Sequence, residues 1–211
     1  MIKELTIGNF RSIREATLAL GKFTVLNGAN NSGKSSVLYA LQVLKNVVTN
    51  PNRSVDELLN LGFLNLGGLE NASYLHKIKE LNISVSAIVG KMEANYGIGL
   101  REKHNRLYIQ GIEPYEFNET IMVSFPYALN KTIKIKEENS HFSAMWNGIQ
   151  PTVIESKYSA KPSSMQNRQF IDKIRKQFAV PIFLLYSTDV IPTQRGFTKP
   201  IFIFWNSTSA S

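Results

Sequence analysis

The pattern of hydrophobic and polar positions over the first 27 residues predicts three strands. Residues 1–9 place apolar side chains at alternating positions, and residues 13–20 do so less strictly. Residues 10–12 separate the two stretches, so they look like a pair of strands. Residues 23–27 form a short apolar run that predicts a third, buried strand.

The pattern then changes to the spacing of a helix. Over residues 36–44 the apolar side chains recur every three or four positions, at Val37, Leu38, Leu41 and Leu44. Pro51 predicts the end of this helix near residue 50, because proline excludes further helix. Residues 54–57 read Ser-Val-Asp-Glu, a capping-box pattern that predicts a short helix to residue 59 or 60. The glycine-rich stretch 61–71 is expected to be a surface loop.

From residue 81 to residue 155 the period switches to two. This pattern predicts an antiparallel meander, with strands in residues 81–88, 106–109, 120–123 and 132–136. Further on, apolar positions from 165 to 178 outline one face of a helix that Pro181 ends. Two apolar runs, 182–186 and 201–205, predict buried strands, with a loop at 193–197 between them.

Residues 28–35 carry the strongest chemical signal. They read Gly-Ala-Asn-Asn-Ser-Gly-Lys-Ser, which fits the G-x-x-x-x-G-K-[ST] pattern of a Walker A loop between a predicted strand and a predicted helix. Gly28 and Gly33 leave room for backbone N–H groups to wrap a phosphate, and the helix N-terminus directs its positive dipole end at the anion. The alternative is a chance match in a turn rich in Gly, Ser and Asn.

The motif assigns a role to each residue type. Lys34 is expected to reach the β- and γ-phosphate oxygens, and the Ser35 hydroxyl to bind a Mg²⁺ ion that bridges them. The predicted nucleotide-binding set is Gly28, Asn30, Asn31, Ser32, Gly33, Lys34, Ser35 and Ser36, with Ser35 as the metal ligand. ATP and Mg²⁺ are therefore the expected cofactors.

Composition limits the partners and the compartment. The chain has 211 residues, no cysteine, no apolar run of membrane-spanning length and no secretory leader, so we expect a cytoplasmic protein without membrane insertion. The net charge of +8 and the pI of 9.6 favour an anionic partner. The lysines are spread along the chain, which fits a solvated basic surface as well as a nucleic-acid interface.

The opening of the chain resembles the start of ABC-type ATPases of the SMC/RecF/OLD branch. The resemblance rests on a strand followed by Asn-Phe-Arg-Ser at residues 9–12 and then a Gly-x-Asn-x-x-Gly-Lys-Ser loop at 28–35. It implies a P-loop α/β core beside an antiparallel β sub-lobe. It also implies that Arg11 lies near the phosphates of the nucleotide; the residues alone allow a solvent-exposed turn arginine equally well.

Other parts of the family's machinery have no counterpart in the sequence. An apolar strand ending in Asp-Glu is missing, and the nearest candidate, Asp189, is followed by Val190. The family's Leu-Ser-Gly-Gly signature and switch histidine are missing as well, and His76, His104 and His141 are interpreted as structural. We therefore expect an incomplete domain, the N-terminal portion of a longer ATPase, that alone hydrolyses ATP negligibly.

The expected organisation is a single lobe over residues 1–211. Its parts are a phosphate-loop core (1–50), a helical and loop connection (51–80), the antiparallel sub-lobe (81–160), and a helix with returning strands (161–211). The leading hypothesis is an ATP-binding ATPase that forms a homodimer around ATP and acts on DNA or a nuclease partner. The alternative is a stand-alone nucleotide-binding module without turnover; a small P-loop kinase is disfavoured by the strands after the loop.

Overall fold

The structure is a computed structural model. It describes residues 1–49, 54–77, 80–89, 92–100, 106–112, 121–124, 131–137, 140–146, 151–156, 172, 179 and 182–188. In the strands beyond residue 100 it describes the backbone and its pairing.

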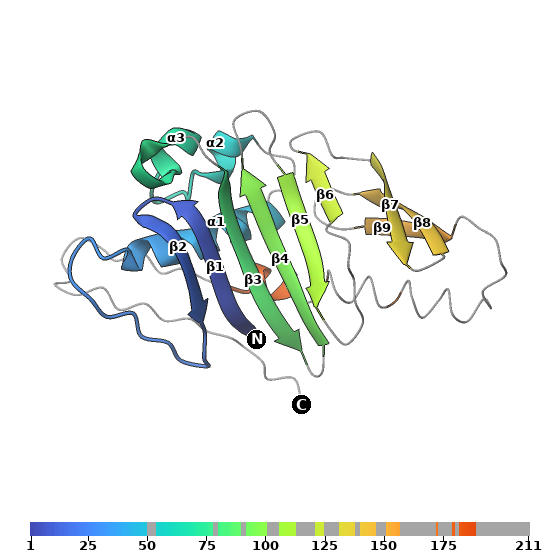
Figure 1. Ribbon diagram of the computed structural model, residues 1–211, viewed down its shortest axis with the longest axis horizontal. Helices are drawn as coiled ribbons and strands as arrows, with labels where there is room; N and C mark the ends of the chain where they lie inside the picture. The colour runs from blue at the N-terminus through green and yellow to red at the C-terminus, as the bar shows by residue number, and fades with distance from the viewer. Residues whose placement is uncertain are drawn as a thin grey trace.

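A six-stranded antiparallel sheet forms the main layer, in the order β2-β1-β3-β4-β5-β6 (Figure 1). Its strands are β1 (Ile2–Phe10), β2 (Ile13–Ala19), β3 (Leu81–Val89), β4 (Met92–Leu100), β5 (Arg106–Ile112) and β6 (Ile121–Ser124). The register of β1 places Leu5 opposite Leu18 of β2 and Val85 of β3, so one face of the sheet gathers apolar side chains. Strands from the first 20 residues and from beyond residue 81 thus share one sheet.

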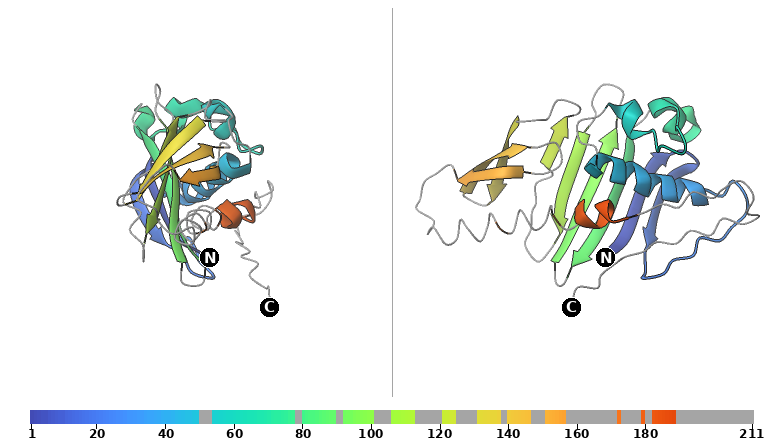
Figure 2. Two further views of the ribbon diagram at one scale, coloured as in Figure 1. Left: turned by 90° about the vertical axis from the view of Figure 1, so that its right-hand side faces the viewer. Right: turned by 180° about the vertical axis from the view of Figure 1, so that it is seen from behind.

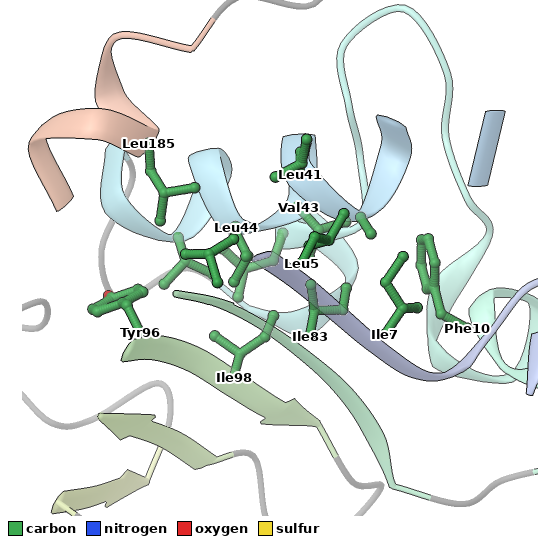
Figure 3. Packing of buried hydrophobic residues seen from close by; sticks show 14 of the residues in the cluster. Leu5, Ile7, Phe10, Leu41, Val43, Leu44, Ile83, Tyr96, Ile98 and Leu185 are labelled. Atoms are coloured by element: carbon green, nitrogen blue, oxygen red, sulfur yellow. The ribbon is translucent and has the colours of Figure 1, made fainter. Parts of the chain in front are cut away.

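The helix α1 (Lys34–Thr49) covers this apolar face (Figure 2). Its buried residues include Leu41, Val43 and Leu44, which pack in one hydrophobic cluster with β1, β3 and β4 (Figure 3). A fully buried side chain of this size contributes about 1.5–3 kcal/mol, so the packing fixes α1 on the sheet. The predicted helix is confirmed, and it ends at Thr49, where the sequence predicts its end.

Three short helical elements follow α1, and the two labelled helices among them lie near the end of the sheet where β1 turns into β2 (Figure 1). They are α2 (Val55–Leu58), α3 (Gly68–Ala72) and the 3₁₀ helix η1 (Tyr74–His76). The predicted capping box is confirmed, because the Ser54 and Glu57 side chains each bond the other's backbone N–H. The surface loop predicted at 61–71 is wrong in part: Leu61 and Leu66 are buried in the core, and residues 68–72 are helical.

The predicted antiparallel pairing after residue 81 is confirmed, but the strands do not form one meander, and β3 also pairs with β1. The strands β3 to β6 pair in sequence order, and β7 (Lys131–Glu137), β8 (Ser140–Trp146) and β9 (Pro151–Ser156) form a second, three-stranded antiparallel sheet. Every strand pairing among the described residues is antiparallel.

The buried strand predicted at residues 23–27 is wrong. These residues form no strand, and Phe23 and Val25 are 78% and 68% exposed. A strand needs a neighbour to pair its backbone N–H and C=O groups. Among the described residues, β1 already pairs with β2 and β3 and no strand pairs with 23–27, so two strands rather than three precede the first helix.

The strand predicted at residues 182–186 is also wrong, because these residues are helical. Leu184 and Leu185 are buried while Phe183 and Tyr186 are exposed, which is the order that one helical turn on a core produces. A short apolar run does not distinguish a strand from a buried helical turn. Of the helix predicted before it, residues 172 and 179 are described, both helical; the predictions at 189, 193–197 and 201–205 lie outside the described residues.

Candidate functional site

The residues of the sequence motif connect to the N-terminus of α1. We call residues 28–36 the phosphate loop, after the role that the sequence predicts for them. The first helical hydrogen bond runs from Val37 N–H to the Gly33 carbonyl at 3.1 Å, so the preceding N–H groups at the helix start have no partner within the helix. Gly33 has φ +90°, and a Cβ there would lie 3.2 Å from Ser12 Oγ. The backbone conformation therefore favours glycine, and an added Cβ would be in tight contact with Ser12.

The ammonium group of Lys34 lies over the backbone of the loop. Its Nζ donates to the carbonyl oxygens of Gly28 at 2.8 Å and Ala29 at 2.6 Å, and to Ser32 Oγ at 3.3 Å. These neutral acceptors hold the cation beside the helix N-terminus. A phosphate oxygen is a stronger acceptor because it is charged, so the residues fit a phosphate group at this position.

The two serines that follow Lys34 have different environments. Ser35 is exposed on the cavity, where its hydroxyl is accessible to a metal ion. Ser36 is 5% exposed, and its Oγ lies 3.1 Å from Ser12 Oγ in the turn between β1 and β2. Ser36 therefore also joins the loop to the neighbouring strand pair.

Arg11 lies in the same turn, with a left-handed backbone at φ 52°. Its N–H donates to the Ala72 carbonyl at 2.7 Å, and its guanidinium lies over the Tyr39 ring, 5.2 Å from the centroid. Its buried Nε has no hydrogen-bond partner among the described residues. The structure thus excludes a fully solvent-exposed turn arginine and places Arg11 on the cavity beside the phosphate loop; its contact with phosphate stays a prediction.

A cavity of about 950 Å³ brings the predicted residues together. From the predicted set it is lined by Arg11 and by all seven residues Asn30, Asn31, Ser32, Gly33, Lys34, Ser35 and Ser36. Gly28 joins the loop through the hydrogen bond from Lys34. The described lining contains Arg11, Lys34 and His76 but no carboxylate, so its charge favours an anion.

The sequence did not identify the rest of this cavity's lining. Ser12 in the turn between β1 and β2 also lines it, as do residues of α1 and of the segment around α3 and η1: Tyr39, Leu66, Asn71, Ser73, Leu75 and His76. His76, interpreted as structural from the sequence, is exposed in this part of the lining. A possible signal was the glycine pair at 67–68, since both residues have positive φ and lead the chain into α3.

Comparison with protein families identifies the class. Residues 1–189 match the family model described as an AAA ATPase domain, and the chain belongs to that family. Membership implies a P-loop α/β fold that binds ATP, usually with Mg²⁺. No curated protein and no solved structure matches the chain significantly.

Within the described part of the chain, no group of three or more His, Cys, Asp or Glu side chains is placed to hold a metal ion. No helix among the described residues is long and apolar enough to cross a membrane.

Proposed function

We propose that this protein binds Mg²⁺-ATP through the phosphate loop, as an ATPase of the SMC/RecF/OLD-like ABC type. The observation that carries the proposal is the position of Lys34 Nζ, which lies within hydrogen-bond reach of three loop oxygens beside the N-terminus of α1. Membership of the AAA ATPase domain family supports ATP as the nucleotide. The cavity above the loop supplies the space for it.

Each residue then has a role that follows from its chemistry. The N–H groups at the start of α1 bind phosphate oxygens, and Lys34 exchanges the Gly28 and Ala29 carbonyls for the β- and γ-phosphates. The hydroxyl of Ser35 binds Mg²⁺, which neutralises the same phosphates. Arg11 adds a second cation from the β1–β2 turn. Asn30, Asn31 and Ser32 lie in the turn of the loop, where the Ser32 N–H donates to the Ala29 carbonyl at 3.3 Å.

The finer part of the proposal follows from the resemblance of residues 9–12 and 28–35. In the branch that they resemble, ATP drives dimerisation of the full-length protein. We extend this to a homodimer here, in the cytoplasm, with DNA or a nuclease as the partner. The net charge of +8 supports an anionic partner. Sedimentation of the full-length protein with and without Mg²⁺-ATP tests the dimer: an unchanged mass would contradict it.

The second candidate is a stand-alone nucleotide-binding regulatory or scaffold module that binds ATP without turnover. It is favoured by the cavity lining, whose described charged side chains are cations suited to hold an anion. Release of inorganic phosphate by the full-length protein separates the two candidates, because under the first candidate residues 1–211 alone are expected to hydrolyse ATP negligibly. Turnover that Lys34→Ala abolishes supports the ATPase, whereas tight binding without phosphate release supports the module.

Replacing Lys34 tests binding itself. Lys34→Ala removes a charge-assisted contact worth about 1.5–3 kcal/mol, so we expect the affinity for Mg²⁺-ATP to fall about ten- to a hundredfold. Titration calorimetry measures it. The matched control is Lys22→Ala, which removes the same charge from an exposed position outside the cavity lining. Equal affinity of wild type and Lys34→Ala would refute the assignment.

A further inference from the structure

The cavity lining outside the phosphate loop differs from the loop in chemistry. The loop presents backbone groups, serine and asparagine side chains and Lys34, which suit a phosphate chain. The rest of the lining includes the Tyr39 ring, two leucines and the imidazole of His76. A nucleotide has the same two parts, because an anionic phosphate chain is joined to a flat, mostly apolar base with hydrogen-bonding edges.

Leu75 is the most informative residue of this part of the lining. It is 61% exposed, although leucine favours burial, and it lines the cavity. Its backbone is left-handed at φ 55°, and so is that of His76 at φ 52°. Left-handed leucine is unfavourable, because its Cβ approaches the following carbonyl oxygen. Two consecutive residues of this kind persist only where surrounding contacts determine the backbone, which is typical of ligand-binding positions.

The surrounding contacts are present on both sides of this turn. Ser73 pairs with Phe10 at the end of β1, and the Arg11 N–H bonds the Ala72 carbonyl. The Ser73 hydroxyl donates to the Leu69 carbonyl at 2.7 Å, and the His76 N–H donates to the Ser73 carbonyl at 3.2 Å. The segment is therefore fixed to the same turn that supplies Arg11. These bonds hold Leu75 out on the cavity instead of in the core.

The size of the cavity agrees with a ligand larger than a phosphate chain. Its volume of about 950 Å³ lies near the top of the range of roughly 300–1,000 Å³ typical of small-molecule sites. A triphosphate on the loop leaves the part lined by Tyr39, Leu75 and His76 for the rest of the molecule. That part offers one exposed apolar side chain and one ring able to donate or accept a hydrogen bond.

We propose that Tyr39, Leu75 and His76 form a nucleoside-binding subsite, which holds the base and ribose of the nucleotide whose phosphates the loop binds. This inference rests on the proposed function, because it assumes a nucleotide on the phosphate loop. Leu75 provides apolar contact to the base, and His76 provides a hydrogen bond to the nucleoside. The Tyr39 ring makes a cation–π contact with the Arg11 guanidinium.

The test compares ATP with inorganic tripolyphosphate, each with Mg²⁺, by titration calorimetry. Leu75→Gly is the informative variant, because glycine adopts the left-handed backbone without strain and the protein is expected to fold at least as stably. We expect Leu75→Gly to bind ATP about five- to tenfold more weakly and to bind tripolyphosphate as wild type does. His76→Ala should show the same selective loss.

Two controls keep the outcomes separate. Lys34→Ala should weaken both ligands, and Phe183→Ala, which removes an exposed aromatic outside the cavity lining, should weaken neither. If Leu75→Gly and His76→Ala leave ATP binding unchanged while Lys34→Ala weakens it, the subsite is wrong and the phosphate loop assignment stands. If wild type binds neither ligand, the proposed function itself fails.

Discussion

Tyr96 carries the sharpest prediction about stability. Its side chain is fully buried in the cluster between α1 and the sheet, near Leu44 and Leu185 (Figure 3). Its hydroxyl oxygen has no hydrogen-bond partner among the described residues. Tyr96→Phe removes this hydroxyl and keeps the ring, so the hydrophobic contacts remain.

The magnitude follows from what the hydroxyl loses on folding. Burying such a group without a partner costs about 1–3 kcal/mol. The space left by the oxygen is about the size of a methyl group or smaller, which offsets about 1 kcal/mol at most. We therefore expect Tyr96→Phe to raise the free energy of unfolding by about 1–2 kcal/mol.

The pH dependence adds an independent check. Burial raises the pKa of Tyr96 above its ordinary value of 10.0, because the charged phenolate is disfavoured in the core. Because the folded protein holds this proton more tightly than the unfolded chain, the free energy of unfolding does not change with the titration of Tyr96 below the unfolded pKa and falls as the pH rises beyond it. Wild type should therefore lose stability above pH 10.0 relative to Tyr96→Phe, by up to about 1.4 kcal/mol per pH unit.

Urea denaturation followed by circular dichroism, at about pH 7 and about pH 11, measures both effects. Tyr74→Phe is the matched control, since Tyr74 is only partly buried and lies in η1. Destabilisation of Tyr96→Phe at neutral pH would show that the hydroxyl makes a favourable bond, and would refute the reasoning. An equal loss of stability between the two pH values in wild type and Tyr96→Phe would refute the argument from the raised pKa of Tyr96.

Two further substitutions test local geometry. Gly33→Ala places a Cβ 3.2 Å from Ser12 Oγ at a positive φ, so we expect a loss of about 1–3 kcal/mol in urea denaturation and weaker ATP binding in calorimetry. The matched control is Gly62→Ala, also at positive φ but with no atom within 4 Å of its Cβ; equal losses would show that the contact with Ser12 is unimportant. Ser54→Ala removes the cap of α2 and its bond with Glu57, and should cost about 0.5–2 kcal/mol in thermal unfolding. An unchanged melting temperature would mean that α2 is stabilised by packing instead.

The sequence predicted those features that a local pattern determines. Residues 34–49 form a helix because apolar side chains recur at helical spacing after a loop that ends in Gly33. The capping box at Ser54 and the strand pair at 1–20 follow equally from neighbouring residues. Arg11 and the phosphate loop line one cavity because the turn between β1 and β2, which contains Arg11, contacts the end of the loop.

Prediction from the sequence failed where the structure depends on residues distant in the chain. Residues 23–27 have a strand-like composition, but no strand pairs with them among the described residues. Residues 182–186 are helical because Leu184 and Leu185 pack together on the core. The left-handed backbone of Leu75 has no local signal, since leucine does not favour it and the contacts that hold it come from β1.

The turn between β1 and β2 connects the two ends of the cavity. Ser12 contacts Ser36 at the start of α1, while the Arg11 N–H bonds the Ala72 carbonyl at the end of α3. The Arg11 guanidinium then lies over Tyr39, which belongs to α1 but faces the cavity. Two adjacent residues thus fix the distance between the phosphate loop and the proposed nucleoside subsite. A nucleotide spans the phosphate loop and this subsite, so a shift of the turn would change how its phosphates and base are bound together. This dependence gives a physical reason for Asn-Phe-Arg-Ser to precede the loop in the sequence.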